Sequence, residues 1–168
     1  SVLANSTNRR SNDVSLIVWF LDLVKRLQPT TFSLENVAAR PIKDILSQRG
    51  IAFGTYRCSD FGVPQTRRRL LAGSLELVHA MNTDASLRHG PVSVRDALPH
   101  LEASIALIRC SGGKVEARAL RPVDGLGFTI LSCGKDAFFT KGWKCVRVAT
   151  IRELLVLQTF PKTYLMES

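Results

Sequence analysis

Apolar residues recur at helical spacing in three stretches of the chain. The first stretch, SNDVSLIVWFLDLVKRLQP, carries one broad apolar stripe; Ser11 or Asn12 can cap a helix there and Pro29 stops it, which predicts a largely buried helix. The stripe consists of Val14, Ile17, Leu21 and Val24, widened by Trp19, Phe20, Leu23 and Leu27. The second stretch predicts a helix over residues 41–49, because Pro41 suits a first turn and Gly50 suits the position after a last turn.

The third stretch is the segment TIRELLVLQTFP near the C-terminus. Thr150 and Glu153 have the spacing of a capping box, and Pro161 marks a stop, so we expect a helix between them and the proline. The residues expected to face a core are Ile151, Leu154 and Leu155.

Short apolar runs between these helices predict strands. The run Thr31–Leu34 ends abruptly in Glu35 and Asn36. Two further runs occupy residues 51–60 and 68–75. The first 75 residues therefore alternate helix, strand, helix, strand, loop and strand, which favours an α/β layer with a mainly parallel sheet and functional loops at its strand C-terminal ends.

After about residue 76 the pattern weakens to short apolar pieces between glycine-containing turns. The pieces are SIALIRC, GFTILSC and AFFTKGW. This pattern predicts a small, irregular, β-rich region. We therefore expect residues 1–75 to form one α/β portion, residues 76–146 the β-rich region, and residues 147–168 the segment with the last helix.

The charge balance favours a polyanionic partner. Lys and Arg total 23 against 14 Asp and Glu, for a formal net charge of +9 at pH 7. The basic residues are scattered and do not gather on one long amphipathic helix, so nucleic acid is favoured over a membrane surface. The most apolar stretch, Val14–Leu27, is interrupted by charges and is too short for a bilayer, which needs about 20 apolar residues.

Cysteine usage and the first residues bear on the cellular compartment. The cysteines Cys58, Cys110, Cys133 and Cys145 lie far apart, without a Cys-x-x-Cys or a neighbouring His. Neither a metal site nor a disulfide framework is therefore predicted. Ser1–Asp13 is polar and shows no signal-peptide pattern. We expect a reduced intracellular chain, cytoplasmic in a prokaryote or nuclear in a eukaryote.

Glu35 leaves the end of an apolar run, and two interpretations are open. A carboxylate partly withdrawn from water holds a proton more readily, and such an acid can protonate or hydrogen-bond a ring nitrogen. Alternatively, Glu35 caps the helix that begins at Pro41 or pairs with an arginine.

Three consecutive arginines follow a Gly-Val-Pro turn. If they continue into a strand, alternation sends Arg67 and Arg69 to one side and Arg68 to the other. The planar guanidinium group recognises a carbonyl oxygen or a phosphate with fixed geometry and keeps its charge. An exposed basic edge that discourages aggregation is the alternative.

Three segments resemble, in the same order, motifs of the DNA cytosine-5 methyltransferases. ENV at 35–37 is similar to the Glu-Asn-Val motif, and FGVPQTRRR at 61–69 to the Gly-x-Pro-Gln-x-Arg-x-Arg motif. RVATIRELLVLQTFPKTY at 147–164 is similar to the Arg-x-Leu-Thr-x-Arg-Glu…Gln-x-Phe-Pro motif. Weaker similarities to the family lie in VSVRDALPHL at 92–101 and FTILSCG at 128–134.

The resemblance implies both a fold and a reaction. The fold is a partial Rossmann-like methyltransferase sheet with a small target-recognition region, and the partner is double-stranded DNA. The reaction swings a cytosine out of the duplex into a pocket. A cysteine thiolate adds to ring carbon 6, carbon 5 takes a methyl group from S-adenosylmethionine, and loss of the carbon-5 proton releases the enzyme.

The resemblance also implies residue roles. Glu35 matches the acid that engages ring nitrogen 3, and Asn36 supports the pocket at the strand end. Arg67 and Arg69 match the two motif arginines, of which one holds the cytosine carbonyl oxygen and the other steadies the pocket or backbone. Gln65 is expected to fix the loop by hydrogen bonds.

Further basic residues are expected at DNA phosphates or in solvent. Arg68 falls on the variable position of its motif. Candidates among the turns of the recognition region are Lys114, Arg118, Arg121, Lys135, Lys141 and Lys144. Arg152 and Glu153 are expected to be structural, joining the last helix to the base of that region.

Three features of the family have no counterpart in the sequence, and one of them is the Gly-Asn-Ser segment that follows the last motif. The Pro-Cys-Gln nucleophile loop and the glycine-containing loop for S-adenosylmethionine are absent, so no catalytic cysteine and no cofactor-binding residue is assigned. Cys58 lies nearest the motifs, but buried structural thiols are the commoner case.

The missing segments also bear on association. A partial sheet would leave an uncovered edge that is prone to association.

We therefore expect a fragment or subunit of a DNA cytosine-5 methyltransferase that is inactive alone. A complementary chain carrying both missing loops is the expected partner. A non-catalytic DNA-binding or regulatory module of the same fold and an RNA-directed relative are the alternatives.

Overall fold

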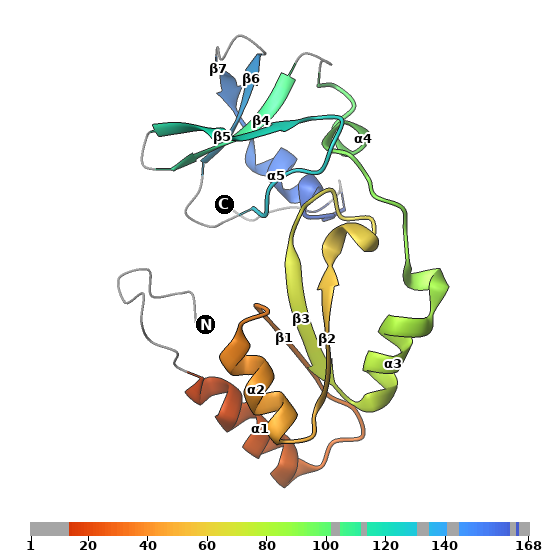
Figure 1. The fold of residues 1–168 in the computed structure, drawn as a ribbon. Coiled ribbons are helices and arrows are strands. Elements are labelled where there is room, and N and C mark those ends of the chain that lie inside the picture. The colour runs from red at the N-terminus through yellow and green to blue at the C-terminus, as the bar shows by residue number, and fades with distance from the viewer. Residues whose placement is uncertain are drawn as a thin grey trace. The chain divides into compact units, whose positions relative to one another are not determined.

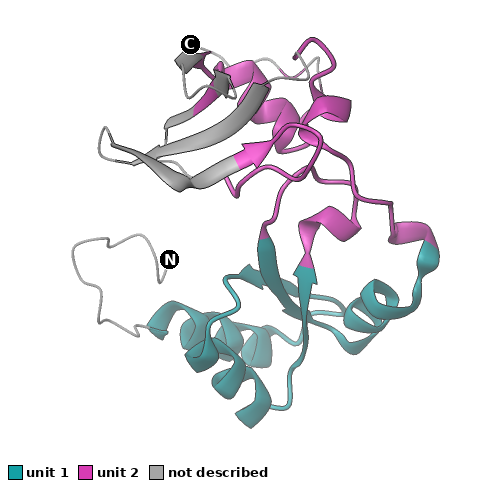
Figure 2. Cartoon of the chain, turned by 45° about the horizontal axis from the view of Figure 1, so that its top comes forward, with its two compact units in different colours: residues 1–56, 68–85 teal, residues 57–67, 86–168 magenta. Residues whose placement is uncertain are grey.

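A computed structural model describes residues 14–101, 105–111, 114–130, 135–140, 145–161 and 164. The chain divides into two compact units (Figure 2). The first takes the residues up to 56 together with residues 68–85, and the second takes residues 57–67 and those from 86 onward. The loop that precedes the three arginines thus belongs to the second unit, whereas the sequence interpretation placed the boundary after residue 75.

The first unit consists of a three-stranded sheet with helices beside it (Figure 1). Its elements are α1 (Ser15–Leu27), β1 (Ser33–Asn36), α2 (Arg40–Gln48), β2 (Ala52–Arg57), β3 (Arg68–Gly73) and α3 (Leu75–Thr83). The strand order is β1-β3-β2, so β3 is central. The helix expected at residues 41–49 is confirmed to within one residue at each end. The first helix is also confirmed, but its N-cap is Val14, and the predicted caps Ser11 and Asn12 lie outside the described residues.

The central strand runs antiparallel to β1, which corrects the expectation of a mainly parallel sheet. Ser33 lies opposite Gly73, and Asn36 lies opposite Leu70. Residues 58–67 connect β2 to β3. This connection is shorter than the dozen or more residues that a parallel crossover needs, so it favours a reversal of the chain at β3. The strand β1 also lies two residues later than predicted, so that Glu35 and Asn36 are its last residues.

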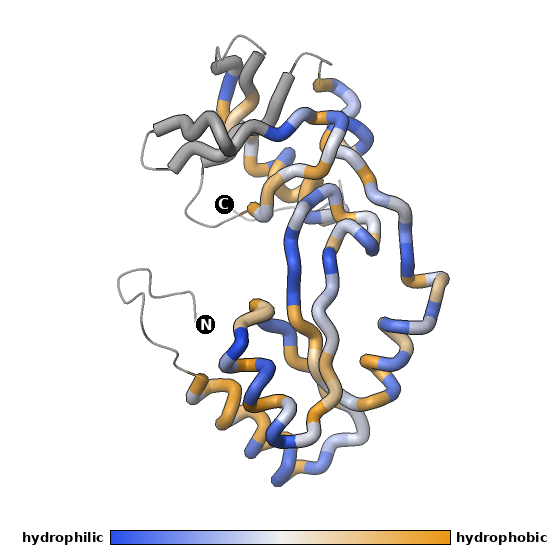
Figure 3. Tube along the Cα trace, in the orientation of Figure 1, coloured by the Kyte–Doolittle hydropathy of each residue, from blue (hydrophilic) through white to orange (hydrophobic). Residues whose placement is uncertain are grey.

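The core of the first unit lies between the sheet and the helices α1 and α2. Its buried residues are Ile17, Leu21, Ile42, Leu46, Leu70 and Ala72. Gly73 belongs to the other face of β3, where a Cβ atom would lie 3.1 Å from Leu77 of α3. The strand β3 changes from hydrophilic to hydrophobic along its length (Figure 3). The apolar end therefore anchors the strand in the core and leaves its arginine end free for other contacts.

The helix α1 is less buried than its sequence predicted. Trp19 is 61% exposed and Leu27 is 65% exposed, and Leu16 beside them is also exposed. The helix carries apolar residues over more than one face, and the sequence pattern does not show which face meets the core. In the part of the chain that the structure describes, neither α1 nor any other helix has the length and apolar character to cross a membrane.

The sequence interpretation did not predict the helix α3. Val78 is the buried residue that it supplies to the unit. Without a repeated apolar stripe, a helix has little periodicity that a sequence pattern can reveal.

The second unit contains a four-stranded antiparallel sheet with two short helices. Its elements are η1 (Cys58–Asp60), α4 (Val94–Ala97), β4 (Ile105–Ser111), β5 (Lys114–Pro122), β6 (Lys135–Thr140), β7 (Cys145–Val148) and α5 (Ile151–Leu157). The strand order is β5-β4-β6-β7, and each neighbouring pair is antiparallel. The expected β-rich character is confirmed, and the sheet has register shifts between Ile108 and Cys110 and between Phe138 and Phe139.

The helices α4 and α5 pack in the core of the second unit. The buried apolar residues there are Val94, Leu98, Leu101, Val123, Phe138, Ala149 and Leu157. The capping box at α5 is confirmed, because Thr150 and Glu153 bond each other's backbone N–H groups. The predicted core face is wrong at Ile151, which is 64% exposed. Ile151 is the first residue of the helix, and the residues that α5 buries are Glu153 and Leu157.

Candidate functional site

Glu35 and Arg69 meet on one face of the sheet in the first unit. Glu35 lies opposite Leu71 in the antiparallel ladder, and Arg69 is two residues before Leu71, so the two side chains are diagonal neighbours. The guanidinium Nε of Arg69 lies 2.6 Å from the carboxylate Oε1 of Glu35. The antiparallel direction causes this contact, because it places the end of β1 beside the start of β3.

The pair lies partly in water. The side chain of Glu35 is 57% exposed and that of Arg69 is 23% exposed. The expected withdrawal of Glu35 from water is therefore wrong for this structure, and the alternative interpretation, a pair with an arginine, is observed. An ion pair with this exposure is worth about 1 kcal/mol or less, so a ligand can displace it at low cost.

Each side chain of the pair keeps bonding capacity for a ligand. Arg69 Nη1 donates to the carbonyl oxygen of Arg68 at 2.8 Å, which holds the guanidinium group beside the strand. Among the described residues, no further partner engages Glu35 Oε2 or Arg69 Nη2. The pair thus presents a hydrogen-bond acceptor beside a donor.

The other two arginines lie elsewhere. The strand begins at Arg68, whose side chain is exposed, so alternation separates Arg68 from Arg69 as expected. Arg67 precedes the strand and belongs to the second unit, where its carbonyl oxygen accepts a hydrogen bond from the Cys58 N–H at 2.8 Å. Arg67 lies one residue before the strand, so its grouping with Arg69 stays a prediction.

Asn36 closes the strand β1. Its Oδ1 accepts a hydrogen bond from the N–H of Val37 at 2.7 Å. Such a local side-chain bond competes with the ladder and favours the end of a strand. Asn36 thus shapes the backbone directly after Glu35.

Gln65 is a buried anchor in the second unit. Its side chain is 1% exposed, its Nε2 donates to the Leu157 carbonyl at 2.6 Å, and its Oε1 accepts from the Ile130 N–H at 3.1 Å. The Thr66 N–H also bonds the Gly127 carbonyl at 3.0 Å. Gln65 therefore ties the loop before the arginines to two segments that are distant in sequence.

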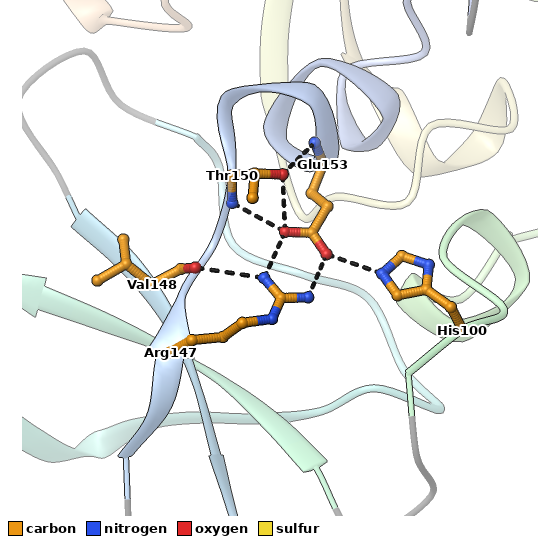
Figure 4. Close-up of polar contacts among 5 residues, drawn as sticks. All are labelled: His100, Arg147, Val148, Thr150 and Glu153. Atoms are coloured by element: carbon orange, nitrogen blue, oxygen red, sulfur yellow. Dashed lines mark hydrogen bonds and ion pairs between the residues drawn. The ribbon is translucent and has the colours of Figure 1, made fainter.

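Glu153 lies at the centre of a polar network, which Figure 4 shows. Arg147 donates to both of its carboxylate oxygens, at 2.6 and 2.7 Å. The Thr150 N–H donates at 2.8 Å, and His100 Nε2 lies 2.8 Å from Oε1. The capping-box spacing predicted the Thr150 contacts. No sequence signal connected Glu153 with Arg147 or His100.

This network keeps Glu153 ionised. Burial opposes its charge, but hydrogen bonds from Arg147, from Thr150 and from His100 outweigh that effect and lower the pKa of Glu153 from 4.5 to about 2. The same contact raises the pKa of Arg147 above its ordinary value. The structural role that the resemblance implied for Glu153 agrees with these contacts.

The structure describes only some of the remaining candidate side chains. Cys58 lies in η1 and not in a strand, and its half-buried thiol forms no disulfide. Lys114, Arg118 and Lys135 lie on β5 and β6, but their side chains are not among those described, and Lys141 and Lys144 lie outside the described residues. The Arg121 guanidinium lies 5.3 Å from the Phe128 ring. Within the described ranges, no group of three or more metal-binding side chains occurs.

Comparisons of the chain with protein-family models, with curated proteins and with solved structures found no match. A function for this chain therefore rests on its three sequence motifs and on the geometry of its side chains. The contact between Glu35 and Arg69 is the feature of that geometry with the clearest chemical meaning.

Proposed function

We propose that this chain is the target-base-binding part of a DNA cytosine-5 methyltransferase. The observation that carries the proposal is the ion pair between Glu35 and Arg69, since each residue comes from a different motif and the fold brings them within 2.6 Å. In this proposal the sheet of the first unit is part of a Rossmann-like methyltransferase sheet. The four-stranded sheet of the second unit belongs to the target-recognition region.

The free groups of the pair match the edge of a cytosine. That edge presents an amino donor beside two acceptors, the ring nitrogen 3 and the carbonyl oxygen. Glu35 Oε2 accepts from the amino group, and Arg69 donates to the carbonyl oxygen. The weak, half-exposed ion pair is the resting arrangement, which an incoming base replaces.

The two residues then assist attack on the ring. Once the base has replaced the ion pair, Glu35 can share a proton taken from solvent with ring nitrogen 3, which withdraws electrons from carbon 6. A thiolate adds to carbon 6, a methyl group forms a bond to carbon 5, and loss of the carbon-5 proton with departure of the thiolate restores the ring. S-adenosylmethionine supplies the methyl group when it is bound.

The nucleophile and the methyl donor are assigned to a polypeptide segment outside these 168 residues. The sequence contains no Pro-Cys-Gln, and no cysteine occurs among the described residues of the first unit. The strand β1 is an edge of its sheet, and an open strand edge is a surface on which another strand can pair. A segment that pairs there would lie next to Glu35.

A methyl-transfer assay with radiolabelled S-adenosylmethionine tests the proposal. The purified chain is measured on duplex DNA alone and with a recombinant polypeptide that carries the Pro-Cys-Gln half of a cytosine-5 methyltransferase. We expect DNA binding without methyl transfer by the chain alone, and incorporation into DNA when both polypeptides are present. Incorporation by the chain alone would contradict the assignment of the nucleophile.

A matched pair of variants connects the assay to the site. Glu35→Gln keeps the shape of the side chain but removes its charge, and it should abolish partner-dependent incorporation. Glu76→Gln changes an exposed carboxylate on α3 of the same unit and should leave incorporation unchanged. Equal activity of both variants would show that Glu35 has no role in the reaction.

A non-catalytic DNA-binding module is the second candidate. The net charge of +9 and the lack of a cysteine in the first unit favour it. Binding that falls steeply with salt, ignores sequence and is unaffected by Glu35→Gln would support it. Competition between duplex DNA and folded RNA distinguishes an RNA-directed relative from both.

A further inference from the structure

The second unit contains a pocket of about 430 Å³ beside the helices α4 and α5. Leu98, Pro99 and Val156 contribute apolar lining, and His100, Arg152 and Glu153 contribute polar groups. The pocket is built by the two segments VSVRDALPHL and TIRELLVLQTF, whose helices pack together in the core. A site between packed helices holds its side chains in place better than a site on loops alone.

The two charged side chains that line this pocket, Glu153 and Arg152, differ in whether they have a partner. Glu153 is a carboxylate, but Arg147 and Thr150 saturate its oxygens, and Arg147 neutralises its charge. Arg152 is exposed and lines the pocket. Among the described residues, neither a hydrogen bond nor an ion pair engages its guanidinium group. The resemblance assigned Arg152 a structural role, yet these contacts leave it available to an anion.

His100 adds a second polar group with a fixed orientation. Its Nε2 is held 2.8 Å from Glu153 Oε1, so its Nδ1 remains for another partner. When the ring is protonated, Nδ1 is a donor. The side chain of His100 is 56% exposed, so a ligand can reach it from solvent.

We propose that this pocket binds one backbone phosphate of a nucleic acid. Arg152 contacts the phosphate oxygens, and His100 donates from Nδ1 when it is protonated. The apolar lining from Leu98, Pro99 and Val156 contacts the sugar carbons next to the phosphate, which a free phosphate ion lacks. The choice of a nucleic acid rests on the proposed function, whereas the affinity of the pocket for a phosphodiester does not.

The salt dependence of DNA binding measures the contact. When one phosphate-binding side chain is removed, log K falls less steeply with log salt concentration, and the magnitude of the slope decreases by about 1. Binding also weakens equally on all sequences. We expect this change in Arg152→Gln on any duplex. Arg26→Gln, which removes an exposed arginine from α1, is the control and should retain the wild-type slope. A wild-type slope in Arg152→Gln would overturn the proposal.

A second measurement tests phosphate binding by the pocket independently of the proposed function. Nuclear magnetic resonance signals of the Arg152 side chain and the His100 ring are followed while dimethyl phosphate or inorganic phosphate is added. We expect dimethyl phosphate to shift both signals more strongly than inorganic phosphate does, with little change at Arg26. Such shifts without any duplex binding would leave the pocket standing and refute the proposed function. Shifts that are equal at Arg152 and Arg26 would refute the pocket.

Discussion

The buried carboxylate Glu153 should make the second unit sensitive to acid. Its pKa is lowered from 4.5 to about 2 because the bonds from Arg147, Thr150 and His100 outweigh the effect of burial. The Glu153 side chain is 8% exposed, so solvent screens these contacts little. At about 1.4 kcal/mol per pKa unit, the ionised carboxylate stabilises the folded unit by about 3 kcal/mol.

The sign of this effect sets the pH window. A carboxylate whose pKa is lower in the folded than in the unfolded state gives its full stabilisation above the unfolded-state pKa. For Glu153 this stabilisation is lost as the pH falls from about 4.5 towards about 2. Wild type should therefore lose about 3 kcal/mol more than Glu153→Gln over this range. Other carboxylates titrate in both proteins and cancel in the comparison.

Hydrogen exchange at the backbone amides of α5 is the assay for this effect. It reports opening of the second unit without requiring that the two units unfold together. The free energy of opening at Leu157 is measured in both proteins between pH 2 and pH 6, with rates corrected for intrinsic exchange. Parallel curves for wild type and Glu153→Gln would refute the reasoning. They would show that the polar network does not hold Glu153 ionised.

Three further substitutions test the packing. Gln65→Leu should destabilise the second unit by roughly 2 to 4 kcal/mol, because it leaves the Leu157 carbonyl without its donor and the Ile130 N–H without its acceptor; hydrogen exchange in α5 measures this loss. Gly73→Ala should cost about 1 to 3 kcal/mol in urea unfolding, because its Cβ atom would clash with the Phe32 carbonyl oxygen, and a wild-type midpoint would contradict that clash. Trp19→Gln should change the urea unfolding free energy by about 0.5 kcal/mol or less, because the indole is largely exposed; a loss typical of a core residue would show that α1 is packed on that face.

Helical periodicity explains why some elements could be predicted. The helices α1 and α2 follow from apolar spacing and from the residues at their ends, and α5 follows from its capping box. The exposure of Trp19 could not be predicted, because α1 is apolar on more than one face. The helix α3 has too little apolar periodicity to stand out.

The side-chain contacts of the candidate site could not be predicted from local sequence patterns either. Glu35 and Arg69 were both recognised as candidate residues, but their contact depends on strand direction, which local sequence does not encode. Gln65 reaches a carbonyl group 92 residues away, and Glu153 reaches His100, 53 residues away. Such contacts come from the packing of the whole unit, so a local pattern can suggest the residue type but cannot identify its partner.

The affinity of the chain for an extruded cytosine tests the role of Glu35 and Arg69 most directly. A mispaired base is easier to flip out of the duplex than a paired one, so a duplex with one mispaired cytosine should bind more tightly than the fully paired duplex or one with a mispaired thymine. Arg69→Met and Glu35→Gln should each remove this preference while leaving the affinity for the paired duplex nearly unchanged. Equal binding of the three duplexes by the wild-type chain, or an unaltered preference in both variants, would contradict the proposal that this pair holds the target base.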